Sequence, residues 1–213
     1  MNKRRSAGRP RKQPVQERSR ATVAAIHRAT IQVLNREGLA RCTTTRVAER
    51  AGVSVGSVYQ YYSGRDVLLV AVLDGHLQRV SAEIEVCCAR LTPEDTLETV
   101  AQTLVGAIVG AKLKNPAEAR SLYVVAREYQ SQQVIDRASK RVVHAFATAL
   151  DRLGFGLDAL EVSTTLIRAI GGVLEGLLTR GARANDIATA EMHLCSLSAG
   201  YLKERLSSAR RRT

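Results

Sequence analysis

The sequence predicts an all-α protein with about nine helices, and three observations support this fold class. Nearly every segment between residues 16 and 206 carries apolar residues at three- and four-residue steps, the spacing of one helix face. No segment alternates apolar and polar residues with the period of two that a half-buried strand requires. Residues that cap or end helices recur between the apolar stretches.

The first 14 residues are the exception to the helical pattern. They hold six basic side chains, separated by glycine and proline, and offer nothing that could pack, so we expect a flexible basic arm over residues 1–14. The Gly-Arg-Pro-Arg run at 8–11 is similar to an AT-hook core, which would place Arg9 and Arg11 in an A·T-rich minor groove. A full core has arginine where Ala7 stands, so a solvated tail that adds only nonspecific attraction is the alternative.

Three helices are expected in residues 15–64, which form the first domain. The first helix ends at Gly38, because glycine tolerates the left-handed conformation that follows many helices. Two short helices around a turn at Gly52 then make a helix-turn-helix, and a hydroxyl residue before each of them can cap it. The expected helices cover about residues 16–37, 44–51 (capped by Thr43) and 55–61 (capped by Ser54).

Residues 65–213 are expected to form a second helical domain, which begins with a long linking helix over about 65–89. Residues 92–95 (Thr-Pro-Glu-Asp) predict the next helix start, with a cap, a proline at the first position and acids that complement the helix dipole. Residues 115–118 (Asn-Pro-Ala-Glu) repeat this pattern and open a helix that reaches about residue 130. The remaining expected helices cover about residues 131–153, 158–180 and 185–206.

Positive charge is concentrated in the N-terminal third of the chain. The chain has 32 Lys and Arg residues against 20 Asp and Glu, a net charge of +12. Residues 1–70 hold 14 of the basic and 4 of the acidic residues, so they supply +10 of that charge. A basic head on a nearly neutral body indicates that the head binds a polyanion. No stretch of 18 or more residues lacks charge, and no apolar segment follows the basic N-terminus, so neither a membrane span nor a signal peptide is expected.

The cysteines and histidines favour neither a metal site nor a cofactor. None of the four cysteines has CxxC spacing, which fits free thiols in a reducing cytoplasm. The adjacent pair Cys87-Cys88 could sense redox state or could simply fill space between helices, and the sequence leaves both open. No two histidines lie four residues apart as a metal-binding pair would on a helix. We expect no cofactor, no metal and no association with a membrane.

The second short helix has a surface suited to the major groove of DNA. Its first residues are small, which permits close approach to base edges, and Val55 can meet a thymine methyl group. Gln60 and nearby hydroxyls can hydrogen-bond bases or phosphates. Tyr59 and Tyr61 can reach phosphates, and Arg65 of the following helix can hold the DNA backbone from the side.

One run of small, hydroxyl and aromatic residues carries a family resemblance: Thr43-Thr44, Val47-Ala48, Ala51-Gly52-Val53-Ser54, Gly56, Val58-Tyr59, Tyr61-Tyr62 and Arg65, with Leu68 behind it. This run resembles the helix-turn-helix of the TetR family of bacterial one-component repressors, and residues 16–70 follow that family's three-helix head and linking helix. Tyr62 stands where the family usually has Phe, and Arg65 where it usually has Lys. The resemblance implies DNA contacts at Thr44, Ser54, Val55, Gly56, Ser57, Tyr59, Gln60, Tyr61 and Arg65.

The C-terminal domain holds candidates for a ligand pocket. Tyr123 and Arg127 lie in one helix, where they could line a pocket or form an exposed edge with salt bridges. Arg168 and Glu175 lie seven residues apart on an otherwise apolar helix. They could be polar groups of a pocket, or they could form an ion pair between subunits. A pocket built from apolar helix faces favours a lipophilic or aromatic ligand. The candidate ligand residues are Tyr123, Arg127, Phe146 and Arg168.

The helix expected at 158–180 is apolar over an arc too wide for one neighbouring helix. Its glycines allow another helix to approach closely. Two such helices from each of two subunits would make a four-helix dimer interface, as the family resemblance also implies. The candidate interface residues are Ile170, Gly172, Val173, Gly176, Leu177, Leu194, Leu197 and Tyr201.

These patterns predict a homodimeric, cytoplasmic regulator of transcription that binds DNA and is not an enzyme. We expect a repressor that a small-molecule effector releases from a pseudo-palindromic operator, and a ligand-dependent activator is the alternative. An α-helical enzyme with an incidental basic head is disfavoured, because the sequence has no nucleophile–base or metal constellation. A nonspecific architectural protein is the other rival, and its affinity would ignore DNA sequence.

Overall fold

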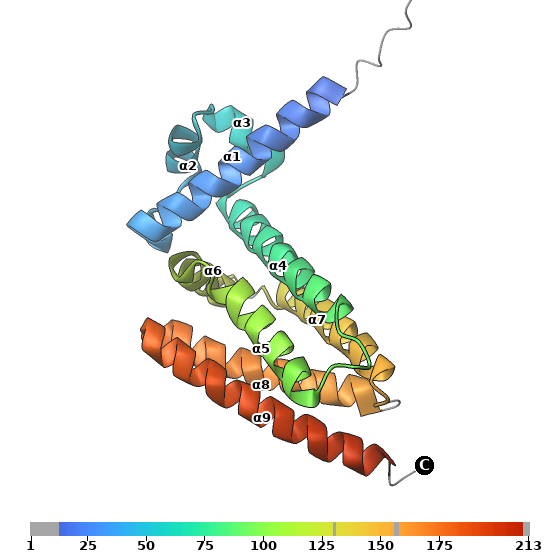
Figure 1. Cartoon of the computed structure of the whole chain (residues 1–213). Helices are drawn as coiled ribbons and strands as arrows, with labels where there is room; N and C mark the ends of the chain where they lie inside the picture. The colour runs from blue at the N-terminus through green and yellow to red at the C-terminus, as the bar shows by residue number, and fades with distance from the viewer. Residues whose placement is uncertain (1–12, 130, 156–157, 211–213) are drawn as a thin grey trace, which may run out of the picture. The chain divides into compact units, whose positions relative to one another are not determined.

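The structure of the protein is a computed structural model that describes residues 13–129, 131–155 and 158–210. Over these residues it contains nine α-helices, a short 3₁₀ segment at Leu39–Arg41 and no strand, which confirms the predicted all-α class (Figure 1). The chain forms two compact units, Met1–Leu69 and Val70–Thr213. The two units meet within the long helix that the sequence places at the start of the second domain.

The N-terminal unit is a small helical core closed by capped turns. Thr43 Oγ1 accepts a hydrogen bond from the Arg46 backbone N–H at 3.3 Å, and this cap starts the helix at the predicted residue. Gly52 has φ 70°, so the turn uses the left-handed conformation that glycine allows. The helices of this unit are α1 (Gln13–Glu37), η1 (Leu39–Arg41), α2 (Thr44–Ala51), α3 (Val55–Tyr61) and the start of α4 (Arg65–Ala89).

A hydrogen bond fixes the largest polar side chain of this core. Tyr62 is buried, and its hydroxyl lies 2.6 Å from Nε2 of His27 on α1. The partner satisfies the phenol that replaces the more usual Phe, so the substitution leaves no unpaired hydroxyl in the core. Thr30 is also buried, and its Oγ1 donates to the carbonyl oxygen of Ile26 at 2.8 Å. The apolar core side chains are Ile26, Ala29, Val33, Leu34, Cys42, Val47, Ala48, Val58, Leu68 and Leu69.

The C-terminal unit is a bundle in which α5 packs on α9, α7 on α8, and α8 on α9. Apolar side chains from all of these helices and from α4 form one continuous core. Besides the rest of α4, the unit contains α5 (Leu97–Leu113), α6 (Pro116–Glu128), α7 (Gln132–Arg152), α8 (Ala159–Arg180) and α9 (Ala184–Arg210).

The predicted start of α5 at residues 92–95 is wrong. These residues form a turn in which the Thr92 backbone N–H donates to Asp95 Oδ2 at 2.8 Å. The helix begins at Leu97, where Thr96 Oγ1 accepts from the Thr99 N–H at 3.1 Å. Two capping signals lie one turn apart, and burial of the apolar residues after the second one selects it.

Within the described residues, α8 is the one helix long and apolar enough by composition to cross a membrane. A core helix of a soluble protein passes the same test, and α8 buries Val162, Leu166, Ile170 and Leu174 in the bundle. The expectation of no membrane span rested on the finding that no stretch of 18 or more residues in the chain lacks charge.

Candidate DNA-binding surface and effector cavity

The outer surface of α3 carries the aromatic side chains that the sequence predicts for DNA contact. Tyr59 is 52% exposed and Tyr61 is 36% exposed, and Gln60 between them is exposed as well. Thr44, the first residue of α2, has its Oγ1 3.4 Å from the Tyr59 hydroxyl. The fold therefore brings hydroxyl groups of both short helices together on one polar surface.

The first turn of α3 is held by its cap. Ser54 Oγ accepts from the Ser57 backbone N–H at 3.0 Å and lies 2.8 Å from Ser57 Oγ. Gly56 is exposed and adds no side chain, while Val55 is half-buried. The small side chains of this turn allow its backbone to approach base edges closely.

Arg65 has a structural role that the sequence did not predict. Its Nε donates to the carbonyl oxygen of Cys42 at 2.7 Å, and its Nη2 donates to that of Leu39 at 2.5 Å. These bonds tie the start of α4 to the 3₁₀ segment and to the residue that follows it, before α2 begins. Contact between Arg65 and a DNA phosphate stays a prediction.

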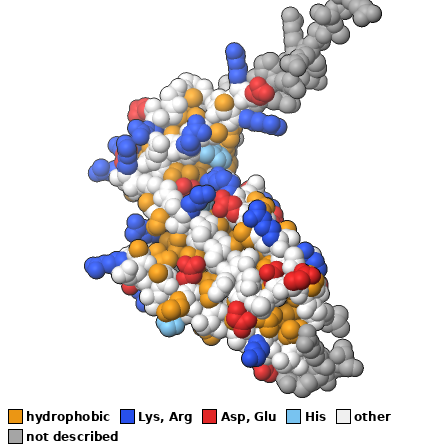
Figure 2. Space-filling model, in the orientation of Figure 1, with side chains coloured by type: hydrophobic (Ala, Val, Ile, Leu, Met, Phe, Trp, Pro, Cys, Tyr) orange, Lys and Arg blue, Asp and Glu red, His pale blue; other side chains and the backbone are white. Residues whose placement is uncertain are grey.

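Two further arginines of α2 extend the basic surface and were not among the predicted site residues. Arg46 forms an ion pair with Glu37, and Arg50 Nε donates to Gln32 Oε1 at 2.6 Å. Both are exposed. Figure 2 shows basic side chains spread over the visible face of the Met1–Leu69 unit. The sequence shows that Arg46 and Arg50 are charged, but the direction in which their side chains point depends on how α2 packs on α1.

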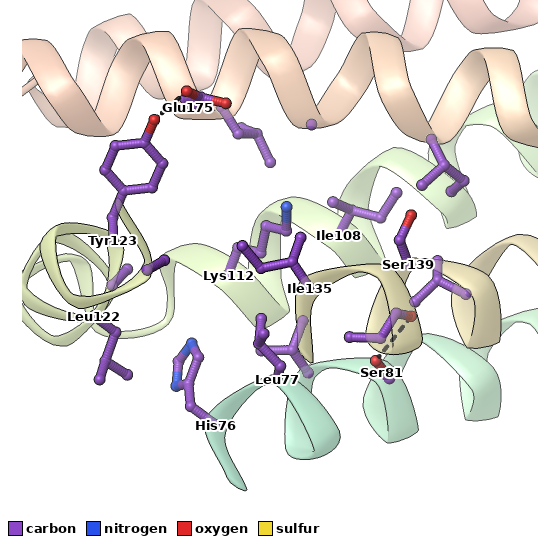
Figure 3. Close-up of a pocket in the computed structure, with 18 of the residues that line it drawn as sticks. His76, Leu77, Ser81, Ile108, Lys112, Leu122, Tyr123, Ile135, Ser139 and Glu175 are labelled. Carbon is purple, nitrogen blue, oxygen red and sulfur yellow. Dashed lines mark hydrogen bonds between the residues drawn. The ribbon is translucent and has the colours of Figure 1, made fainter. Parts of the chain in front are cut away.

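The C-terminal unit contains a partly open cavity of about 430 Å³ between α4, α5, α6, α7 and α8 (Figure 3). This volume lies within the range of pockets that hold small ligands. The walls are mostly apolar, and each of the five helices contributes. The larger apolar residues that line it are Leu73, Leu77, Val80, Ile84, Ile108, Leu122, Ile135, Val142, Ile167, Leu174 and Leu178.

A few polar side chains interrupt these apolar walls. The Tyr123 hydroxyl donates to the carboxylate of Glu175, and this bond raises the pKa of the phenol (Figure 3). Ser81 Oγ donates to the backbone carbonyl of Ala138 at 3.4 Å. The ammonium group of Lys112 points into the cavity (Figure 3). Burial lowers the pKa of Lys112, and the charge of Glu175 opposes that shift.

His76 joins the cavity wall to a neighbouring charge cluster. Its Nδ1 lies 3.0 Å from Glu118 Oε1, which also accepts from Arg79 at 3.3 Å. Burial lowers the pKa of His76 more than Glu118 raises it, so the ring is neutral at neutral pH and its Nδ1–H donates to the carboxylate. This bond links α4 to the first turn of α6.

The helix-turn-helix geometry agrees with a comparison to known families. Residues 26–72 match the family model described as bacterial regulatory proteins, tetR family. The chain belongs to the TetR family of transcriptional regulators. It is therefore a DNA-binding regulator, and the family implies both an operator and an effector ligand.

Relatives and solved structures agree with this assignment. The TetR-family chain is 27% identical over 163 residues to the HTH-type transcriptional repressor KstR of Mycolicibacterium smegmatis, a match that covers 75% of this chain and 78% of KstR. It is 24% identical over 166 residues to the HTH-type transcriptional regulator BetI of Brucella anthropi, covering 76% and 82% of the two chains. SmeT, the repressor of the Stenotrophomonas maltophilia multidrug efflux pump SmeDEF, shares the fold with a TM-score of 0.64 at 21% identity, over 85% of this chain and 90% of SmeT.

The cavity of this TetR-family regulator contains two of the four predicted ligand residues. Tyr123 and Arg168 line it. Arg127 is exposed on α6 and is not part of the wall. Phe146 is 0% exposed within the apolar core and is not among the residues that line the cavity, so its contact with a ligand stays a prediction. Sequence reasoning missed Lys112, although a lone cation in the otherwise apolar second half of α5 is a signal that could have identified it.

The predicted dimer residues of the TetR-family regulator differ in exposure, and they include exposed, half-buried and buried side chains. Val173 is 42% exposed and Leu197 is 69% exposed, and Gly172 is exposed beside Val173. Ile170 and Leu194 are buried in the chain's own core, so little of either side chain is exposed to a partner. Gly176, Leu177 and Tyr201 are half-buried.

The remaining site predictions for the regulator concern cysteines, metals and the arm. Burial raises the pKa of the Cys88 thiol to about 11, which keeps it protonated and unreactive at neutral pH. All four cysteines are free. In the described ranges, no three His, Cys, Asp or Glu side chains are grouped as metal ligands. Arg9 and Arg11 lie outside the described residues.

Proposed function

We propose that this TetR-family regulator is a homodimeric cytoplasmic repressor that a lipophilic small molecule releases from its operator. The cavity carries the proposal. It is large enough for a ligand, it is lined mostly by apolar side chains, and α4 forms part of its wall. The same uninterrupted helix begins at Arg65, which holds the loop before the helix-turn-helix. A ligand that moves α4 would therefore act on the element that positions α2.

The proposed repressor uses α3 as its recognition helix. In the proposal, Gln60 contacts a base or phosphate, Tyr59 and Tyr61 contact phosphates, and Gly56 lets the backbone approach the groove. The basic arm would add electrostatic attraction, and minor-groove contacts of Arg9 and Arg11 remain part of the proposal. Two heads related by a two-fold axis would read half-sites about 34 Å apart, or a multiple of that spacing.

The proposed dimer would form through the outer faces of α8 and α9. Leu197 and Val173 are exposed there, and Met192 is 60% exposed on the same pair of helices. Exposed apolar side chains of this size are costly in water, and a second copy of the same faces would cover them. Gly172 and Gly176 would allow the helices of the two subunits to pack closely.

The effector can release the operator only through a difference in affinity. It would bind the conformation that misfits the operator more tightly than the conformation that fits it. An activator of the same fold would gain operator affinity when the ligand binds, so the sign of the change separates these two functions.

The test begins with selection of genomic fragments by the purified full-length protein, which yields an operator. Gln60→Ala and Tyr59→Ala should then weaken operator binding by about 5- to 150-fold, the usual worth of a good base or phosphate contact. Fluorescence anisotropy with labelled operator measures the affinity. Gln102→Ala, an exposed glutamine on α5, is the matched control and should bind as the wild type does. Unchanged affinity in both α3 variants would contradict the recognition-helix assignment.

A further inference from the structure

Lys112 stands out among the residues that line the cavity. It lies near the end of α5, a helix whose other inward side chains are apolar. Its ammonium group points into the cavity, among Ile108, Ile135 and Leu77 (Figure 3). A cation in apolar surroundings is costly unless an anion or several hydrogen-bond acceptors compensate it.

The chain itself does not supply that compensation. Lys112 makes no ion pair and no side-chain hydrogen bond with any residue that the structure describes, whereas its exposed neighbour Lys114 pairs with Glu83. Glu175 acts on Lys112 electrostatically, but its carboxylate is exposed and already accepts the Tyr123 hydroxyl. Lys112 is half-buried, so water can solvate its charge in the free protein, and a ligand that displaces this water has to supply a negative charge or acceptors in its place.

The other charged groups around the cavity also favour a negatively charged ligand. Arg168 lines the cavity and adds a second positive charge, so the lining has two cations and one anion, Glu175. His76 is held by Glu118 and does not compete for an anion while it is neutral. A cationic lipophile would bring a like charge next to Lys112, which is unfavourable.

We propose that the cavity binds a lipophilic monoanion, with its carboxylate on the ammonium group of Lys112 and its apolar body against the surrounding helix faces. This inference rests on the proposed function only in taking the cavity as the effector site. The size of the ligand follows from the volume. At roughly 30 Å³ for each water-sized group, about 430 Å³ holds a molecule of about fourteen non-hydrogen atoms.

The test compares two probes of equal chain length, dodecanoate and dodecanol, on the full-length protein by titration calorimetry. Dodecanoate matches the estimated size and carries the anion, whereas dodecanol keeps the apolar chain without the charge. We expect wild-type protein to bind dodecanoate about 10- to 100-fold more tightly than dodecanol, the usual worth of a hydrogen bond to a charged group. Lys112→Met should abolish that preference, while Lys114→Met, whose lysine is 77% exposed, should keep it.

Binding of dodecanol to the Lys112→Met protein shows that this variant has kept its cavity, so a loss confined to dodecanoate is a loss of the anion contact. Three results would each overturn the anion site: no binding of dodecanoate, equal binding of the two probes, or an unchanged preference in Lys112→Met. Operator release is measured separately with the same probes. Dodecanoate that binds through Lys112 but leaves the operator bound would contradict the proposed function and leave the anion site intact.

Discussion

Arg65 and Tyr62 depart from the residues that their positions usually carry, and each has an internal partner. Tyr62 hydrogen-bonds His27, and Arg65 reaches the carbonyls of Leu39 and Cys42 with two different nitrogens. A lysine has a single nitrogen at the end of a flexible chain and could not reproduce this two-pronged contact in the same way. The arginine therefore fixes the loop that leads into the helix-turn-helix.

This role predicts that Arg65→Ala destabilises the protein in the absence of DNA. Loss of two hydrogen bonds from a charged donor should lower the free energy of unfolding by about 1–3 kcal/mol. Urea unfolding followed by circular dichroism measures the change. Arg20→Ala, an exposed arginine on α1, is the control and should change stability by less than about 0.5 kcal/mol. A residue that served only as a phosphate ligand would leave stability as it was.

At the scale of the helices, local sequence signals were enough to predict the bounds of the two short helices in the N-terminal unit. The caps Thr43 and Ser54 and the turn at Gly52 are encoded within a few residues, so the predicted bounds of α2 and α3 match the structure. The start of α5 was wrong because two local caps competed, and only the packing of the helix decides between them.

The cavity could be predicted only in part, because five helices far apart in the sequence build it. Tyr123 and Arg168 were found as polar residues on otherwise apolar faces, and the structure places both at the wall. Phe146 carries the same apolar signal as a pocket residue, yet it faces the core. Lys112 carried a sequence signal, a lone cation in an apolar stretch, but its direction into the cavity depends on how α5 packs. The role of His76 depends on its contact with Glu118 on another helix.

The bond between α4 and α6 predicts a pH-dependent stability. The pKa of His76 in the folded chain lies below its ordinary value of 6.5, so the unfolded chain takes up the proton first as the pH falls. The stabilisation by neutral His76 is complete above pH 6.5 and is lost progressively below it. In this window the free energy of unfolding should fall by up to about 1.4 kcal/mol per pH unit.

His76→Asn tests this prediction, because the amide can still donate to Glu118 but does not titrate. The variant should show a shallower loss of stability than wild type between about pH 6.5 and pH 5. The measurement is urea unfolding at a series of pH values, and His193→Asn, on the exposed side of α9, serves as control. Arg79 and Lys112 also act on the ring, so both must stay intact in the comparison. Parallel curves for His76→Asn and wild type would exclude His76 as the source.

At the scale of the whole molecule, the exposed apolar side chains of α8 and α9 predict the oligomeric state. A carboxylate in place of Leu197 would be buried without a partner in the proposed dimer. Leu197→Glu should therefore raise the dimer dissociation constant about thirtyfold or more, as loss of a central contact does. Sedimentation equilibrium measures it. Val86→Glu on α4, where the wild-type side chain is 52% exposed, should leave the constant unchanged. A wild-type monomer, or a Leu197→Glu dimer as tight as wild type, would contradict the proposed interface.

The cavity also has a consequence for folding. The apolar walls of the cavity gain contacts with a ligand that fills it, so binding should raise the stability of the C-terminal unit. A ligand at about a hundred times its dissociation constant adds roughly 2.7 kcal/mol. Heat resistance of the purified chain should thus report whether the cavity is occupied, before any operator or regulated gene has been identified.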